Sequence, residues 1–442
     1  MRSTDCCDDN APLRTLAEAL TAALDSLQPL FETESVSLFD ADGRVLAAEV
    51  IARLDVPPHD NSAMDGFALY RADLQADAPT RLPVIGQALA GHPYRLGAEE
   101  AMVSASPGNA SFPPSTVPRG GAVRITTGAM IPAGPDAVVM QEQCRIALDE
   151  RWIEIEAKTA AKIKPGENIR RRGEDVAVGT RLLSQGLRLR PQDIALAAGQ
   201  GIAALTVVRR LRVAVASTGD ELREPGGELP PGAIYESNRY ILIGLLRRLG
   251  CAVTDLGILR DEREVVLPAL RDAAETHDVL LTSGGVSVGT ADLVKDVIAE
   301  LGKIEFWRLA VKPGKPVTFG RIQNCWVLGL PGNPVSVMVS FLLFARPLLL
   351  KLMGAEPAEP LRMRAMADFT FRRKPGRREW LRARLRFDPE RELLASTYHT
   401  HSSGALSSLS WADGLVELPE DCVGIAPGDT VDYLPFNGLG MN

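Results

Sequence analysis

Three acidic side chains in the second half of the chain follow short apolar runs, in positions where a carboxylate can hold a divalent cation. Glu221 lies in STGDEL, Asp261 follows LGILR, and Asp292 follows the small-residue turn SGGVSVG. Regular alternation of apolar runs and helical patterns from Leu211 onward predicts a parallel sheet, whose functional loops lie at the carboxyl ends of the strands. Carboxylate oxygens there suit Mg²⁺ better than a soft metal.

The turn before Asp292 joins an apolar strand to a helical pattern and is rich in Gly and Ser. Its candidate anion-binding residues are Ser283, Gly284, Gly285 and Ser287. Strand, small-residue loop and helix is the arrangement that turns backbone N–H groups toward an anion. The same pattern also fits a tight turn in which the glycines only permit the bend and Asp292 caps the helix. This stretch alone leaves both interpretations open.

Two lysines and a second Gly-containing turn follow further along the chain. Lys312 and Lys315 stand in KPGKP, where Pro313 and Gly314 hold them apart. The second turn, LPGNPVS, contains Pro331, Gly332, Asn333, Pro334 and Ser336. Carboxylates, lysines and N–H-rich turns together suit a phosphorylated ligand bound with Mg²⁺. Capping acids in ordinary βα turns would explain any one of these loops, but they explain the paired lysines poorly.

Several reaction classes fit these loops badly. No His or Cys lies in them, so a catalytic zinc or a cysteine nucleophile is not expected. The glycines have neither Walker A nor Gly-x-Gly-x-x-Gly spacing, which argues against ordinary ATPases and dinucleotide enzymes. In the first half, NSAMDG places Ser62 and Asp65 in a turn that could bind a polar ligand, although internal Asx hydrogen bonds explain an isolated Asp more simply.

Composition gives the chain's class. Its 442 residues are 45% hydrophobic and 24% charged, which fits a multidomain globular protein. A net charge of −7 argues against general nucleic-acid affinity. The longest apolar stretch, residues 335–350, contains Ser336, Ser340 and Arg346 and is expected to be a buried helix, so no membrane association is predicted. Six scattered cysteines without zinc or disulfide spacing favour a reduced, cytoplasmic setting.

Six motifs, in order and spacing, resemble those of the molybdopterin molybdenumtransferases, a family related to the E domain of gephyrin. They are NSAMDG (61–66), TTGA (126–129), STGDEL (217–222), SGGVSVG-x-AD (283–292), KPGKP (312–316) and LPGNPVS (330–336). The resemblance covers nearly the whole chain, from about residue 13 to 435.

This resemblance implies a multidomain α/β fold and a homodimer. A doubly wound βαβ domain, like that of molybdopterin adenylyltransferase, would comprise residues 13–30 and 191–355. An elongated discontinuous domain would comprise 31–53 and 155–190, an inserted β-rich domain 54–154, and a C-terminal β barrel 356–442. The cleft would be shared between subunits, with Asp65 and Thr127 acting across the dimer interface.

The resemblance also implies the reaction: molybdate and adenylylated molybdopterin give molybdenum cofactor and AMP. Glu221, Asp261 and Asp292 would hold Mg²⁺, and Lys312, Lys315 and Ser336 would attract molybdate and the polyanionic substrate. Arg308, Arg382 and Ser403 match further substrate-binding positions, and Arg suits a tetrahedral oxyanion. The proline residues of the second turn would shape the loop. Molybdopterin adenylyltransferase and apo-molybdoenzymes are the partners implied before and after this step.

Two alternatives remain at the level of sequence. One is a non-catalytic paralogue that stores or delivers molybdenum cofactor; the other is an adenylyltransferase acting one step earlier, against which the inserted domain and KPGKP argue. Tungstate could also replace molybdate, because the two oxyanions have nearly the same size and charge.

Overall fold

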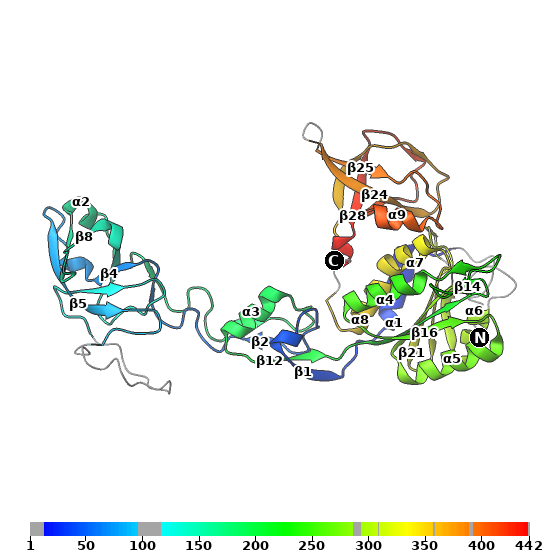
Figure 1. Ribbon diagram of the computed structural model, residues 1–442, viewed down its shortest axis with the longest axis horizontal. Coiled ribbons are helices and arrows are strands. Elements are labelled where there is room, and N and C mark those ends of the chain that lie inside the picture. The colour runs from blue at the N-terminus through cyan, green and yellow to red at the C-terminus, as the bar shows by residue number, and fades with distance from the viewer. Residues whose placement is uncertain are drawn as a thin grey trace. The chain divides into compact units, whose positions relative to one another are not determined.

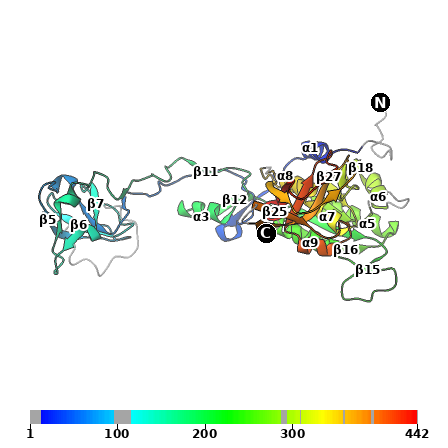
Figure 2. The ribbon, with the colours of Figure 1, turned by 90° about the horizontal axis from the view of Figure 1, so that it is seen from above.

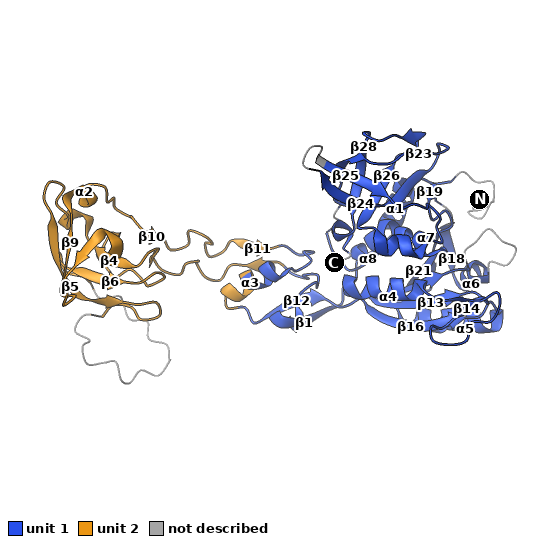
Figure 3. Ribbon diagram, turned by 45° about the horizontal axis from the view of Figure 1, so that its top comes forward, with its two compact units in different colours: residues 1–48, 184–195, 202–442 blue, residues 49–183, 196–201 orange. Residues whose placement is uncertain are grey.

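The protein folds into two compact units (Figure 3). The computed structural model describes residues 13–95, 116–285, 293–307, 309–356, 359–388 and 392–440. Unit 1 comprises residues 1–48, 184–195 and 202–442, and unit 2 comprises residues 49–183 and 196–201. The proposed boundaries of four domains stay a prediction.

Unit 1 is built on a six-stranded sheet in the order β16-β13-β17-β21-β20-β18. The strands are β13 (Arg212–Thr218), β16 (Ala252–Leu259), β17 (Val279–Ser283), β18 (Lys303–Trp307), β20 (Thr318–Ile322) and β21 (Cys325–Leu330). The first four in spatial order run parallel, and β20 pairs antiparallel with both of its neighbours. This confirms the predicted, mostly parallel sheet.

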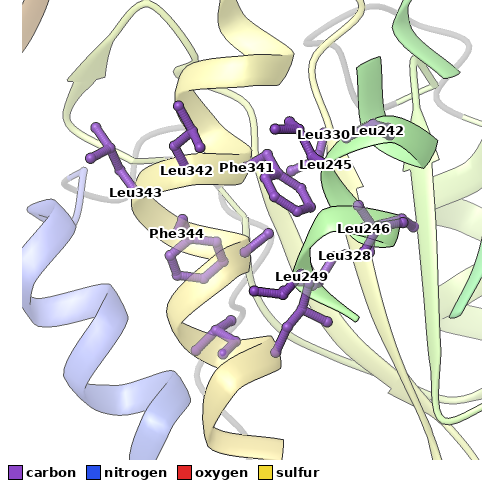
Figure 4. Close-up of a cluster of buried hydrophobic side chains, with 14 of the residues drawn as sticks. Leu242, Leu245, Leu246, Leu249, Leu328, Leu330, Phe341, Leu342, Leu343 and Phe344 are labelled. Carbon is purple, nitrogen blue, oxygen red and sulfur yellow. The ribbon is translucent and has the colours of Figure 1, made fainter. Parts of the chain in front are cut away.

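Both faces of this sheet are covered because both sides of each central strand are apolar. Val213 and Val215 of β13 face one core, and Ala214 and Ala216 face the other. The period of two along a strand produces this division. Helix α4 (Asn238–Leu249) and the long helix after β21 pack against the first face, as Figure 4 shows for their leucine and phenylalanine side chains. Helices α5 (Arg263–Thr276) and α6 (Leu293–Leu301) lie side by side on the second face (Figures 1 and 2).

The long helix runs from Pro334 to Leu352 through α7 (Pro334–Ser340), a π-helical turn (Phe341–Ala345) and α8 (Arg346–Leu352). Its 19 residues are long and apolar enough to cross a membrane, but 83% of the most apolar window is buried inside the protein. The stretch is therefore a core helix, as the sequence predicts, although Ser336, Ser340 and Arg346 do not shorten it.

The N-terminal helix is shorter than its apolar pattern suggests. The pattern predicts residues 13–30, whereas α1 spans Leu16–Ser26. Thr15 caps the helix: its hydroxyl accepts from the Glu18 N–H, and the Glu18 carboxylate accepts from the Thr15 N–H. At the other end, Leu27 is already extended, just before Gln28 and Pro29.

A closed five-stranded barrel forms the C-terminal part of unit 1, which confirms the predicted β barrel. Its strands are β22 (Met363–Ala367), β24 (Arg378–Asp388), β25 (Glu392–Thr397), β26 (Gly414–Leu418) and β28 (Thr430–Pro435). They pair in the order β24-β25-β22-β28-β26, and β26 closes onto β24. The short strand β19 (Val311–Lys312) comes from KPGKP and pairs with β24 from outside. The short helix α9 (Leu406–Trp411) also contacts β24.

Unit 2 is β-rich, as expected for the inserted region. Its sheet has the order β7-β4-β6-β5-β9-β8. The strands are β4 (Gly66–Leu69), β5 (Thr80–Ala88), β6 (Ala122–Ile125), β7 (Ala137–Met140), β8 (Cys144–Ile146) and β9 (Trp152–Ile155). Two short pairs also occur in this part of the chain, β2 (Val50–Ile51) with β11 (Arg181–Leu183) and β3 (Asn61–Ser62) with β10 (Ile169–Arg170). In unit 1, β1 (Thr33–Ser37) pairs with β12 (Ala204–Val208).

Candidate active site

A cavity of about 880 Å³ lies at the carboxyl ends of β13, β17 and β21, between the sheet and the barrel of unit 1. The chain leaves β13 for β16 on one side and returns to β17 on the other, so β13 and β17 flank the topological switch point of the sheet. Ligands of open α/β sheets bind at this point. The cavity is therefore where the fold predicts a site.

The turn after β17 is backed closely by the end of β13. Gly284 and Gly285 have φ angles of 90° and 66°, a region that favours glycine. A Cβ atom on Gly284 would lie 2.4 Å from the Thr218 carbonyl oxygen, and one on Gly285 would lie 2.4 Å from Val294 Cγ2. Both glycines and Ser283 line the cavity. Ser287 and Asp292, predicted in the same turn, lie outside the described residues.

Asn238, at the start of α4, ties the two Gly-containing turns together. Its Nδ2 donates to Ser283 Oγ at 2.9 Å and to the Gly332 carbonyl at 2.6 Å. The two turns are thus held against each other at the cavity wall. Sequence reasoning missed this residue, because an Asn at the start of a helix reads as a cap and its partners are 45 and 94 residues away.

The predicted residues of the second Gly-containing turn, residues 330–336, lie at the same cavity. Pro331, Gly332, Asn333, Pro334 and Ser336 all line it. Asn333 precedes the first turn of α7 in extended conformation, and Pro334 fits the helix start because its missing N–H needs no partner there. The Val335 N–H donates to the Ser403 carbonyl at 3.1 Å, so the barrel loop already uses one of the free donors of this helix end.

Both predicted lysines line the cavity, but in different settings. Lys312 Nζ lies 2.8 Å from Oε1 of Glu379, a buried residue of β24. Lys315 is half-buried, and none of the described residues forms an ion pair with it. Within the described part of the chain, the cavity therefore has one lysine held by an ion pair, Lys312, and one without an ion pair, Lys315. Arg308, a third predicted cation, lies outside the described residues.

Two of the three predicted Mg²⁺ ligands are described, and both line the cavity: Glu221 and Asp261. The pKa of Asp261 is raised, first by partial burial and then by the neighbouring carboxylates of Asp220 and Glu221. Among the residues that the structure describes, no group of three or more His, Cys, Asp and Glu is arranged for a metal. Two carboxylates that repel each other still fit Mg²⁺, which commonly binds one or two carboxylates together with substrate phosphates.

The barrel contributes Arg382 and Ser403, as predicted. Arg382 is 2% exposed: its Nε donates to Ser408 Oγ, and its Nη2 donates to the carbonyls of Thr400 and Ser402, each at 3.0 Å. Burial lowers the pKa of this guanidinium group. Arg382 therefore shapes the 400–403 loop as well as lining the cavity, a role that its sequence position did not reveal.

His401 and Glu379 also line the cavity and were not predicted. The His401 ring packs edge-on against Phe371 with ring centroids 4.8 Å apart. Its pKa is lowered, mainly by burial and next by the positive charge of Arg382. The sequence-based exclusion of histidine concerned the sheet loops, and this histidine comes from the barrel.

Comparison with known proteins supports the resemblance along most of the chain. Three family models match successive regions: "MoeA N-terminal region (domain I and II)" at residues 14–201, "Probable molybdopterin binding domain" at 214–351, and "MoeA C-terminal region (domain IV)" at 364–436. A molybdopterin molybdenumtransferase of Haemophilus influenzae is 38% identical over 426 residues, covering 96% of this chain and 99% of that protein. The chain belongs to the molybdopterin molybdenumtransferase family.

A second curated relative and a solved structure also match the chain over most of its length. Molybdopterin molybdenumtransferase 2 of Mycobacterium tuberculosis is 37% identical over 89% of this chain and 93% of its own. A crystal structure of a molybdopterin biosynthesis MoeA protein from Pyrococcus horikoshii superposes with a TM-score of 0.75 at 32% identity, over 96% of this chain and 99% of that one. Family membership confirms the predicted fold class, the transferase class and a role in molybdenum cofactor biosynthesis.

Two predicted residues, Asp65 and Thr127, belong to unit 2, and neither is among the residues that line the cavity of unit 1. Asp65 Oδ1 accepts from the Thr127 N–H at 2.6 Å and from the Thr127 hydroxyl at 2.9 Å. These bonds lower the pKa of Asp65, the backbone bond most strongly. The structure therefore brings the two predicted residues together within unit 2.

Proposed function

We propose that this transferase inserts molybdate into adenylylated molybdopterin and releases AMP, which completes molybdenum cofactor. The observation that carries the proposal is one cavity lined by Lys312 and Lys315, by the two Gly-containing turns, and by the carboxylates of Glu221 and Asp261. Such a cavity offers donors to phosphate and oxyanion oxygens and acceptors to a cation. The names of the relatives from Haemophilus and Mycobacterium point to the same chemistry.

Within this proposal the cations of the cavity bind the anionic reactants. Lys312 and Lys315 attract the molybdate dianion and the phosphates, and the buried Ser336 hydroxyl adds a donor at the helix start. For Arg382, Nε and Nη2 are committed to protein acceptors, so Nη1 is the nitrogen available to an oxyanion. In the Ser283–Gly285 turn the Gly284 N–H already donates to the Leu330 carbonyl at 3.1 Å, so the Gly285 N–H is the backbone donor that this turn offers to a phosphate.

Glu221 and Asp261 would hold Mg²⁺, with Asp292 as a further ligand. When bound, Mg²⁺ neutralises charge on the phosphoanhydride that is cleaved. Partial burial first, and then the carboxylates of Asp220 and Glu221, raise the pKa of Asp261, and a bound cation would favour its charged form. Water adds to the adenylyl phosphorus, the anhydride bond breaks, and AMP leaves while the terminal phosphate stays on the pterin product.

We further propose a homodimer in which Asp65 and Thr127 complete the partner subunit's cavity. The two hydrogen bonds from Thr127 hold the Asp65 carboxylate in one orientation and keep it ionised. The free thiols of Cys144, Cys251, Cys325 and Cys422 support a reducing, cytoplasmic setting. Molybdopterin adenylyltransferase would supply the substrate, and apo-molybdoenzymes would receive the product.

AMP release tests the proposal directly. The purified protein is given adenylylated molybdopterin and Mg²⁺, with molybdate, with tungstate, or with neither oxyanion. We expect AMP release to depend on molybdate, and the tungstate arm sets the oxyanion preference. Tight binding of the nucleotide substrate without AMP release in any arm would overturn the transferase reaction and identify a storage or delivery protein.

A further inference from the structure

We propose that Glu379 is a positioning residue that aims the Lys312 ammonium group into the cavity, so that the C-terminal barrel sets the geometry of the oxyanion site. The inference rests on the proposed function, because it assigns Lys312 to oxyanion binding. None of the motifs that identify the family contains Glu379, which enters the site only through the fold.

Strand pairing brings the two residues together. Strand β19 lies parallel beside β24, with Val311 opposite Arg378 and Lys312 opposite Glu379. The Arg378 N–H also donates to the Ala310 carbonyl at 3.1 Å, which continues the pairing by one residue. Neighbouring strands lie about 4.8 Å apart, so opposed side chains on one face are within reach. KPGKP is thus fastened to the barrel at the residue that carries the charge.

Glu379 is fixed from the barrel side. Its side chain is 3% exposed, and its Oε2 lies 3.5 Å from Nε of Arg373, which is also 3% exposed. Arg373 Nη1 donates to the carbonyls of Leu418 and Pro419 at 3.3 and 3.4 Å, and its Nη2 donates to the Arg377 carbonyl. A buried carboxylate needs such partners. Arg373 and the barrel backbone therefore decide where Glu379 points.

Glu379 in turn contacts Lys312, which is the more exposed partner of the ion pair. Its side chain is 47% exposed, and its ammonium group meets Glu379 Oε1 at 2.8 Å. An ammonium group has three N–H donors, so one bond to Glu379 leaves two for a ligand. A flexible lysine side chain loses rotamer freedom when it is fixed, and the ion pair fixes it before an oxyanion arrives.

Electrostatic repulsion between Glu379 and a bound oxyanion would act against the positioning effect. Glu379 also places a negative charge beside an anion site, and removing that charge alone would tighten oxyanion binding. Arg373 offsets this charge, and Arg382 and His401 face the same cavity. Positioning and repulsion thus predict opposite changes in the molybdate dependence when Glu379 loses its charge.

The test is Glu379→Gln, measured as AMP release against molybdate concentration. We expect the half-saturating molybdate concentration to rise about tenfold, which is the weight of one charge-assisted hydrogen bond. The matched control is Glu417→Gln: Glu417 is also a buried barrel carboxylate, 2.8 Å from Arg378 Nη1 and 2.9 Å from Arg362 Nε, and does not line the cavity. We expect the control to keep the wild-type molybdate dependence.

A Lys312→Met background separates positioning from general damage. If Glu379 acts through Lys312, Glu379→Gln will not raise the molybdate requirement of Lys312→Met any further. An additive rise in the double variant, a tighter molybdate dependence in Glu379→Gln, or an equal effect of Glu417→Gln would each overturn the proposal. Should the Gln variant not fold, Glu379→Asp takes its place in the same cycle. Failure of the proposed function is distinguishable, since the wild type itself would then release no AMP.

Discussion

Asp261 lines the cavity and has a raised pKa. Its pKa is raised by partial burial and by Asp220 and Glu221, so its charged form is less favourable in the folded protein than in the unfolded chain. For Asp261→Asn we expect the Mg²⁺ concentration needed for half-maximal AMP release to rise at least about tenfold, because a neutral amide is a poorer Mg²⁺ ligand. A Mg²⁺ titration of the rate measures this, with Asp272→Asn on the exposed face of α5 as the control.

Asp261→Asn is expected to weaken Mg²⁺-dependent activity but to increase the stability of the fold. A raised pKa means that the folded protein holds the Asp261 proton more tightly than the unfolded chain does. Stability therefore falls as pH rises from the ordinary Asp pKa through the raised value. Without Mg²⁺, Asp261→Asn should thus be more stable than the wild type at neutral pH, and the difference should vanish at acid pH. Thermal unfolding across that window checks it; a less stable variant at neutral pH would mean that Asp261 supports the fold.

At the residue scale, sequence predicts the groups that stand at strand ends and misses those brought in by long-range pairing. Glu221, Asp261, Lys312 and Lys315 were predictable because the parallel-sheet rule alone puts them at one edge. Glu379 was not, because its place depends on the register of a barrel strand against KPGKP. The assignments of roles to these residues stay predictions.

Among the elements, the turn after β17 has no room for a side chain larger than that of glycine at Gly284. We expect Gly284→Ala to lower the free energy of unfolding by about 1–3 kcal/mol, because a Cβ there meets the Thr218 carbonyl and φ is 90°. Loss of AMP release should accompany it, since the displaced turn lines the cavity. Denaturant unfolding measures the change.

Gly244→Ala is the matched control for this turn. Gly244 lies inside α4, and a Cβ atom at this position would have open space around it, with no described atom outside the helix backbone within 4 Å. Alanine should therefore stabilise the helix by up to about 1 kcal/mol. Equal stability of the Gly284→Ala variant and the wild type would show that the turn can relax, and that its glycines are not required by close packing.

Element types were predictable where the apolar pattern was regular, and boundaries were less so. The strands of the sheet follow from buried runs that are apolar on both sides, whereas α1 starts late because the Thr15–Glu18 capping box decides its first turn. The KPGKP segment reads as a rigid loop, yet its first part becomes β19 because β24 offers an unpaired edge. Local pattern carries no information about that edge.

At the scale of the whole molecule, each of the two units is built from separate segments of the chain. The main part of unit 2, residues 49–183, is inserted between residues 1–48 and 184–195 of unit 1, and the family resemblance implied its β-rich character. Which residues of unit 2 belong to a cavity is a property of the assembly, and the sequence suggests it only through the family resemblance. The shared cleft is therefore a prediction that needs its own experiment.

Mixing two impaired variants tests the shared cleft, at a molybdate concentration that saturates the wild type but not Lys312→Ala. Asp65→Asn removes the unit 2 carboxylate but keeps an oxygen for the Thr127 bonds, and Lys312→Ala removes a cavity cation. If each cavity uses Asp65 of one subunit and Lys312 of the other, a mixed dimer has one site with both lesions and one intact site.

Co-expression of the two differently tagged variants, followed by purification through both tags, isolates the mixed dimer. We expect it to release AMP at about half the wild-type rate, because one of its two sites is intact. Each variant alone should release AMP far more slowly than the mixed dimer, which excludes contamination by wild type. If every site were built within one chain, each site of the mixed dimer would carry one lesion and the rate would stay as low as in the single variants. A mixed dimer as slow as the single variants would therefore place Asp65 in its own subunit's cavity, or outside the reaction.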